Sequence, residues 1–236
     1  MSKRSNLSFQ IAIDGPVAAG KSTIAKLLSD QLSMTYIDTG AMYRTLALAA
    51  QRADVDWDNG PAVAKLAQKI KIRLARPIGN KKDGRPVSVY LENEDISWKI
   101  RELQYGEGAS VVGTHPEVRK ILVKLQQDMC HGKRVVMEGR DIGSKVLPNA
   151  NLKIFMIADQ VERVKRKQEQ LKKVGEKASK KQVQADLISR DTREMTRKID
   201  PLRPTLDAWQ LDTTTMSIER VVRAIVDKVN LLEENQ

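Results

Sequence analysis

A strand, a glycine-rich loop and a helix follow one another in residues 9–32, and this succession constrains the fold more than any other feature. Apolar and more polar residues alternate from Phe9 to Asp14, which predicts a β-strand. Residues 15–22 fit the pattern G-x-x-x-x-G-K-[ST] at every position. The mostly apolar run from Ile24 to Leu32 predicts a helix. This order is the context that a phosphate-binding loop requires.

Residues 15–23, which we call the phosphate-binding loop, are expected to hold the phosphates of a nucleoside triphosphate. Glycines let several backbone N–H groups point at one anion, and the start of the following helix adds its positive dipole end. Lys21 would reach the β- and γ-phosphates, and the Ser22 hydroxyl would bind Mg²⁺. The residues expected to bind the nucleotide are Gly15, Pro16, Val17, Ala18, Ala19, Gly20, Lys21, Ser22 and Thr23.

The composition excludes several classes of protein. The 236 residues suffice for one α/β domain with insertions, and the single cysteine, Cys130, excludes an intramolecular disulfide. Cys130 and His131 lack the partners of a zinc site. Met1 to Leu7 lacks a following apolar segment and predicts no signal peptide, and no apolar run is long enough to span a membrane. We therefore expect a cytoplasmic protein without a membrane partner.

The net charge of +11 is concentrated in one part of the chain. Residues 163–198 contain 13 Lys or Arg and 5 Asp or Glu, so they carry +8 of the total. Aromatic residues are few, at 4%, and do not alternate with basic ones as they do in proteins that stack on single strands. We interpret this segment as a movable arm that closes over polyphosphate, with a solvated helix surface as the alternative.

The remaining chain alternates between predicted helices and strands, which indicates a parallel sheet with helices on both faces. Further strands are predicted at 34–37, 134–137, 152–158 and 208–211. Helices are predicted at 41–52, 62–69, 101–112, 116–130, 161–173, 180–190 and from Ser217 to about 232. Alternating runs at 70–74 and 87–91 flank a polar turn at 79–84 and predict an inserted antiparallel hairpin.

Polar residues follow four of the predicted strands at the point where each strand ends. They are residues 14–15, 38–40, 138–141 and 212–213. Ligands of such sheets bind at the carboxyl ends of the strands. We therefore expect one site assembled from four loops.

Arginines near these loops favour a second phosphorylated ligand. Arg44 follows the second loop, Arg140 lies in the third, and Arg190, Arg193 and Arg197 end the basic segment. A guanidinium binds two phosphate oxygens at once. An enzyme that brings two phosphorylated ligands together needs several such groups, whereas a switch or motor ATPase needs one.

Five segments in order resemble bacterial cytidylate kinases. They are Gly15–Thr23, Asp38–Arg44 (D-T-G-A-M-Y-R), Glu138–Gly143 (E-G-R-D-I-G), Arg190–Asp191 with Arg197, and Leu211–Thr214 followed by Ser217–Glu219. The resemblance covers nearly the whole chain. It implies one kinase domain over residues 1–236, with a monophosphate-binding insertion at about 60–112 and a basic lid at about 160–198. It also implies that the γ-phosphoryl group of ATP is transferred to CMP or dCMP, with Mg²⁺ bound.

The resemblance also implies roles for individual residues. The residues that would bind CMP are Thr39, Arg44, Ser110, Arg119, Arg140, Asp141, Arg190, Glu194 and Arg197. Those that would take part in catalysis are Lys21, Arg140, Arg163, Arg166 and Arg190. Asp141 would accept the cytosine amino group, whereas uracil would leave the carboxylate unpaired at a cost of roughly 1–3 kcal/mol. Glu194 stands where the family usually has an aspartate that contacts the sugar.

Three alternatives remain open from the sequence. The acceptor could be UMP, AMP or shikimate, since the loop and the lid do not exclude these, or the charge could serve a regulatory or RNA-binding protein. A GTP switch is disfavoured, because Asn80–Asp83 is explained by the hairpin turn and no D-x-x-G motif occurs. We expect a monomer that forms no stable complex with nucleic acid.

Overall fold

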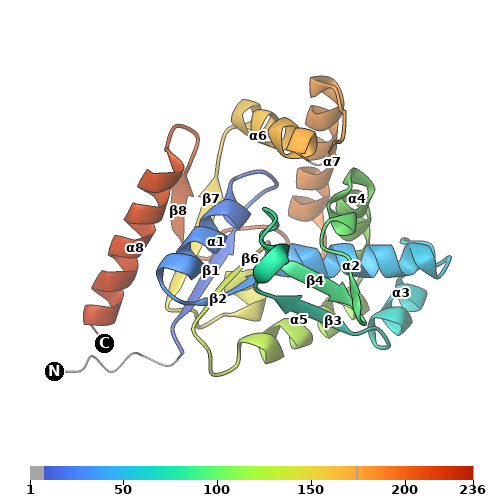
Figure 1. Cartoon of the computed structure of the whole chain (residues 1–236), viewed down its shortest axis with the longest axis horizontal. Coiled ribbons are helices and arrows are strands. Elements are labelled where there is room, and N and C mark those ends of the chain that lie inside the picture. Colours follow the sequence, from blue (N-terminus) through green and yellow to red (C-terminus); the bar gives the residue numbers. More distant parts are fainter. Residues whose placement is uncertain (1–7, 174, 236) are drawn as a thin grey trace.

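The computed structural model describes residues 8–173 and 175–235, and a five-stranded parallel sheet lies at its centre (Figure 1). Met1 to Leu7, where we expect no signal peptide, lie outside the described residues. The strands are β1 (Gln10–Asp14), β2 (Thr35–Asp38), β6 (Val135–Gly139), β7 (Leu152–Ile157) and β8 (Trp209–Asp212). Their order is β2-β6-β1-β7-β8, and every pairing is parallel.

Helices cover both faces of this sheet, as the alternation of elements predicts. Ile11 and Ile13 of β1 pack on one face with α1 (Lys21–Gln31) and α8 (Ile218–Glu234). Ala12 points to the opposite face, where it packs with Cys130 of α5 (Pro116–Cys130). The period of two along β1 therefore divides the core into two layers.

The phosphate-binding loop leaves β1 at a position where only glycine fits. Gly15 has φ +147°, and a Cβ there would lie 2.1 Å from the main-chain oxygen of Met156 in the neighbouring β7. Ala18 has φ +60°, in the left-handed region that favours glycine. Gly20 caps α1, which begins at Lys21. The last three residues of the phosphate-binding loop are therefore helical, and the helix begins before the predicted Ile24.

The insertion between α2 (Thr39–Arg52) and α5 forms a second, antiparallel sheet. It contains α3 (Gly60–Ala67), β3 (Ile72–Ala75), η1 (Gly79–Lys81), β4 (Ser88–Leu91), β5 (Glu94–Asp95), η2 (Lys99–Arg101) and α4 (Leu103–Val112). The predicted hairpin is present as β3 and β4. The third strand, β5, is absent from our prediction because two acidic residues disfavour a strand. It forms because the chain turns back at Glu92, whose φ is +53°.

The basic segment forms two helices near the carboxyl edge of the main sheet, which we call the lid (Figure 1). They are α6 (Gln160–Lys173) and α7 (Lys180–Thr196). We expected α7 to end at Arg190, and this was wrong. No proline or glycine interrupts the helix there, and Glu194 in its last turn is buried. No helix in residues 8–173 and 175–235 is long and apolar enough to cross a membrane.

Candidate active site

A cavity of about 490 Å³ lies at the carboxyl edge of the main sheet, between the phosphate-binding loop, the insertion and the lid. Strands β1, β2, β6 and β8 end at Asp14, Asp38, Gly139 and Asp212. Because these strands are parallel, the four polar loops after them lie at one edge, as predicted. Residues of the first three loops line the cavity, whereas Asp212 and Thr213 of the fourth do not. The size of the cavity suits a nucleotide-sized ligand.

Lys21 is buried beside the cavity and folds back onto its own loop. Its ammonium group donates to the main-chain oxygen of Pro16 at 2.7 Å. Burial, reinforced by the nearby Arg140, lowers the pKa of Lys21 to about 7, although Glu138 and Glu194 oppose the shift. A phosphate placed here would supply the negative charge that favours the charged amine.

Hydroxyl and carboxylate oxygens lie close together where β6 ends. Ser22 Oγ donates to one carboxylate oxygen of Glu138 at 3.0 Å, and the hydroxyl of Tyr36 donates to the other. Burial, together with the charge of Asp38, raises the pKa of Glu138. Hydroxyl and carboxylate oxygens are the ligands that Mg²⁺ prefers. Ser22 therefore fits the role that the motif predicts for it, with Glu138 as its neighbour.

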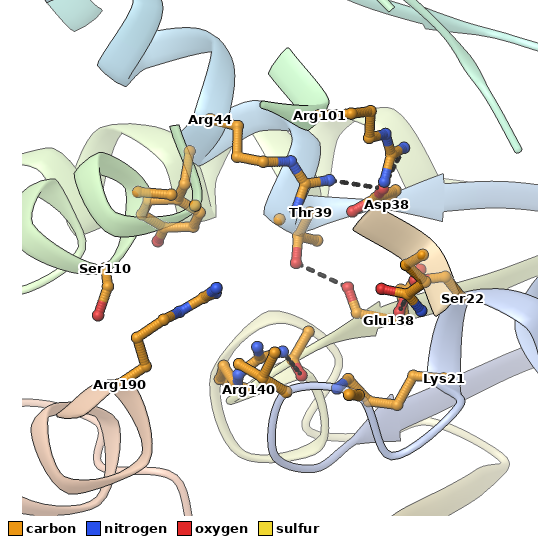
Figure 2. Close-up of a pocket in the computed structure, with 18 of the residues that line it drawn as sticks. Lys21, Ser22, Asp38, Thr39, Arg44, Arg101, Ser110, Glu138, Arg140 and Arg190 are labelled. Atoms are coloured by element: carbon orange, nitrogen blue, oxygen red, sulfur yellow. Dashed lines mark hydrogen bonds and ion pairs between the residues drawn. The ribbon is translucent and has the colours of Figure 1, made fainter. Parts of the chain in front are cut away.

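Asp38 organises the wall formed by α2 and η2. It caps α2 by accepting from the backbone N–H of Ala41 at 2.9 Å, and it also accepts from Arg44 at 2.9 Å and Arg101 at 3.0 Å (Figure 2). Burial alone would raise the pKa of Asp38, but the two guanidiniums outweigh it and lower the pKa to about 2. Thr39 donates to the main-chain oxygen of Glu138 at 2.7 Å.

Arg140 and Arg190 approach the cavity from β6 and α7. Arg140 Nε donates to Glu194 at 2.5 Å, so Glu194 holds one edge of its guanidinium. Arg190 projects into the space between Ser110 and Arg140 (Figure 2). Its ion pair with Asp186 is long, at 3.9 Å. Its guanidinium lines the cavity, close enough to the buried Glu194 to lower the pKa of that carboxyl together with Arg140.

The opposite end of the cavity holds a carboxylate between two guanidiniums. Asp141 accepts from Arg119 Nη2, and its other oxygen lies 3.7 Å from Arg197 Nη2. The Ser110 hydroxyl is buried nearby in the cavity wall and has no hydrogen-bond partner among the described residues. A buried hydroxyl without a partner costs free energy unless a ligand completes its bonding.

Asp14 fixes the loop that carries Arg140 and Asp141. Its two carboxylate oxygens accept from the backbone N–H groups of Ile142 and Gly143, each at 2.8 Å. These amides begin η3 (Ile142–Val146), a single wide helical turn that the sequence does not predict. Burial raises the pKa of Asp14 to about 6, although the two amides oppose the shift.

Arg163 and Arg166 lie outside the cavity lining and contact the phosphate-binding loop from the lid. Arg163 donates to the main-chain oxygen of Val17 at 3.2 Å and to Asp191 at 2.6 Å. Arg166 donates to the main-chain oxygen of Ala19 at 3.3 Å. Their contact with ATP phosphates therefore stays a prediction, whereas their contact with the loop is present.

The structure brings most of the predicted site residues to one cavity. The predicted residues that line it are Val17, Ala18, Gly20, Lys21, Ser22, Thr23, Thr39, Arg44, Ser110, Arg119, Arg140, Asp141, Arg190, Glu194 and Arg197. Gly15, Pro16 and Ala19 shape the loop behind it. Sequence reasoning missed Arg101 and Lys167, which also line the cavity. Arg101 stands in a short turn and Lys167 among many lysines, so neither had a distinguishing signal.

Fold and cavity together define a class of protein, the P-loop phosphotransferases of the α/β type, here with a basic lid. A family model described as cytidylate kinase matches residues 11–231, and the chain belongs to this family. A cytidylate kinase of Chromobacterium violaceum is 41% identical over 217 residues, which are 92% of this chain and 93% of the relative. One of Bacillus cytotoxicus is 43% identical over 216 residues, 92% of this chain and 93% of the relative.

A solved structure supports the fold alone. The crystal structure of an uncharacterized protein from Eubacterium ventriosum matches with a TM-score of 0.54 at 9% identity, covering 94% of this chain and 99% of that chain. Identity this low carries no information about substrate.

Proposed function

We propose that this chain transfers the γ-phosphoryl group of ATP to CMP or dCMP, giving ADP with CDP or dCDP. Membership of the cytidylate kinase family over residues 11–231 carries the proposal. The cavity supports it, because a loop for a triphosphate lies opposite a second basic wall that suits a monophosphate. A binding protein for one nucleotide would need only the first of these.

The phosphate-binding loop would hold the donor. Its amides and Lys21 would bind the β- and γ-phosphates, and Lys21 would exchange the oxygen of Pro16 for phosphate oxygens. Ser22 would bind Mg²⁺, with Glu138 holding the hydroxyl in place. The metal, when bound, neutralises charge on the transferring phosphoryl group. Arg163 and Arg166 would act from the lid by supporting the loop and approaching the phosphates of ATP.

The arginine wall would hold the acceptor phosphate. Arg44 and Arg140 are each held along one edge by a carboxylate, Asp38 and Glu194 respectively. Such bonding fixes the guanidinium. Arg140 also donates from Nη1 to the main-chain oxygen of Gly139 at 3.1 Å, so Nη2 is the donor that we assign to a ligand. Arg190, which extends into the cavity, would offset the repulsion between donor and acceptor. Arg197 would act from the same side at the end of the lid.

The base would lie against Asp141. Cytosine presents an amino donor, which a carboxylate accepts. Arg119 and the unpartnered Ser110 hydroxyl would serve the acceptor atoms N3 and O2. Uracil would place a carbonyl oxygen against the Asp141 carboxylate, so two acceptors would face each other without a hydrogen bond. Thr39 and Glu194 would lie nearer to the sugar.

Phosphoryl transfer requires that the two nucleotides are positioned and that the charge of the transition state is stabilised. The acceptor phosphate is already ionised, so no general base is required, and the transition state of phosphoryl transfer is loose. The cavity side chains would hold donor and acceptor in line, and the lid would exclude water so that CMP is phosphorylated. A cytoplasmic monomer without nucleic-acid partners remains our expectation from the sequence.

The test is ADP formation from Mg·ATP by the purified chain, with one acceptor at a time. Fast turnover with CMP and dCMP, and slow turnover with UMP and AMP, is the expected result. Comparable turnover with UMP would contradict the role of Asp141. ADP formation from water alone, unchanged by any acceptor, would contradict the proposal as a whole.

A further inference from the structure

Asp200 contacts both guanidiniums that flank Asp141 at the proposed cytosine end of the cavity. Asp141 lies between Arg119 and Arg197. Arg119 also donates from Nε and Nη2 to Asp200 Oδ2, at 3.3 Å each. Arg197 Nε donates to the main-chain oxygen of Asp200 at 2.7 Å. Asp200 therefore contacts both guanidiniums, Arg119 through its carboxylate and Arg197 through its main-chain oxygen.

The backbone at Asp200 is adapted to this position. Its φ is +47°, in the left-handed region that aspartate and asparagine tolerate better than most residues with a side chain. The side chain is only 11% exposed, so its charge is stabilised by its partners more than by water. Its other oxygen lies 3.1 Å from the ammonium group of Lys145, a half-exposed residue of η3.

Asp200 determines which donors of Arg119 remain for a ligand. Nε and Nη2 of Arg119 are engaged by Asp200 and Asp141. Nη1 has only long contacts, 3.4 Å to the main-chain oxygen of Gly113 and 3.5 Å to the hydroxyl of Tyr43. Both partners of Nη1 are uncharged, so a base can replace them at less cost than the carboxylates that hold Nε and Nη2. The Nη1 end of the guanidinium is therefore the end presented to the cavity.

We propose that Asp200 is a positioning residue that sets base selectivity, by holding Arg119 along one edge and placing a second carboxylate beside its guanidinium. This inference rests on the proposed function. With Asp200 present, the carboxylates of Asp141 and Asp200 both offset the charge of Arg119. Without the Asp200 carboxylate, Arg119 pairs with Asp141 alone, and the uncompensated positive charge favours the carbonyl oxygen of uracil. The amino group of cytosine then has less advantage.

The experiment compares steady-state ADP formation with CMP and with UMP in the full-length wild-type chain, Asp200→Gly and Asp200→Asn. Both replacements tolerate a positive φ, so the backbone is preserved. Asp200→Gly should raise the KM for CMP roughly tenfold and lower the ratio of kcat/KM for CMP to that for UMP by a similar factor. The kcat with CMP should change by less than about twofold, since Asp200 touches no reacting atom. Asp200→Asn, which keeps one acceptor without the charge, should lie between.

Lys145→Ala is the matched control, because it removes the other partner of Asp200 and leaves Arg119 in place. Its KM for CMP and its base selectivity should match the wild type. An unchanged KM and selectivity in Asp200→Gly would overturn the proposal, and so would an equal loss of kcat with both acceptors. The proposed function would still stand in either case, provided that the wild-type chain phosphorylates CMP. A wild-type chain that does not phosphorylate CMP would overturn both.

Discussion

The proposed donor and acceptor sides of the cavity are built in different ways. The phosphate-binding loop is one contiguous segment whose conformation depends on glycine at the start and end of its turn, and we propose that its main-chain groups bind the phosphates of ATP. The acceptor side is assembled from side chains on α2, α4, α5, α7 and the loop after β6. Main-chain groups recognise any phosphate, whereas side chains from separate elements can discriminate between bases. We therefore expect the phosphate-binding loop to serve phosphoryl transfer and the acceptor side to determine which acceptor is used.

The largest expected effect comes from the side chain that the donor loop contributes. Lys21→Ala should lower kcat by at least about 10²–10³-fold, because it removes a preorganised charge from the transferring phosphoryl group. ADP formation with saturating CMP measures this. Circular dichroism should show an intact fold, and Lys124→Ala on the exposed side of α5 should be without effect. Near-normal turnover by a folded Lys21→Ala variant would contradict the proposed mechanism.

Asp14 ends the strand before the phosphate-binding loop and is hydrogen-bonded to the loop that follows Arg140 and Asp141. Titration of its carboxyl tests this connection between the two sides of the cavity. Its pKa in the folded chain is raised from 3.8 to about 6, so its contribution to stability is fully present below the unfolded value and is lost as pH rises through 6. The free energy of unfolding of the wild type, minus that of Asp14→Asn, should therefore fall by up to about 3 kcal/mol from about pH 4 to about pH 7. Urea denaturation at each pH measures it. A difference that is constant with pH would contradict the buried, ionisable carboxyl.

The acceptor side should lose affinity without losing stability when Ser110 is replaced. Ser110→Ala removes a buried hydroxyl that has no partner within the described part of the chain, so the free energy of unfolding should stay equal or rise slightly. The KM for CMP should rise roughly tenfold. Ser88→Ala is the control, since Ser88 is equally unpartnered but lies in β4 outside the cavity lining. An unchanged KM in Ser110→Ala would remove this residue from the base site.

The smallest effect concerns the donor loop, at Ala18. Its φ of +60° strains a residue with a Cβ, and glycine relieves that strain while gaining entropy in the unfolded chain. Ala18→Gly should therefore change stability by less than about 1 kcal/mol and leave kcat within about twofold. Ala19→Gly, at a buried position without positive φ, should destabilise the chain by about 1 kcal/mol or more. Equal destabilisation by both would contradict the strain at Ala18.

The same contrast explains what the sequence could predict. The motif from Gly15 to Ser22 is contiguous, so its place between β1 and α1 follows from local pattern alone. Strand alternation placed four loops at one edge of the sheet, and the structure confirms that placement. On the acceptor side, the positions of the arginines predicted a second phosphorylated ligand, and the residues for the base and sugar came from resemblance to a family. These residues line the cavity, but their roles stay predictions.

The remaining features depend on tertiary contacts that no local pattern records. Arg101 reaches Asp38 across 63 positions, and Asp14 reaches Ile142 across 128. The strand β5 exists through pairing with β4, against its own propensity. Asp200 carries no sequence signal at all, because its importance arises from the two arginines that fold against it.

An ion pair connects the lid to the acceptor side of the cavity. Arg193 on α7 pairs with Glu107 on α4 at 2.6 Å, so the arm over the donor and the wall around the acceptor are connected directly. Both side chains are partly exposed, so the pair stabilises this connection only modestly. Where binding of one ligand changes the affinity for a second, the second changes the affinity for the first by the same factor. We thus expect ATP and CMP each to change the affinity of the chain for the other, by the same factor in both directions.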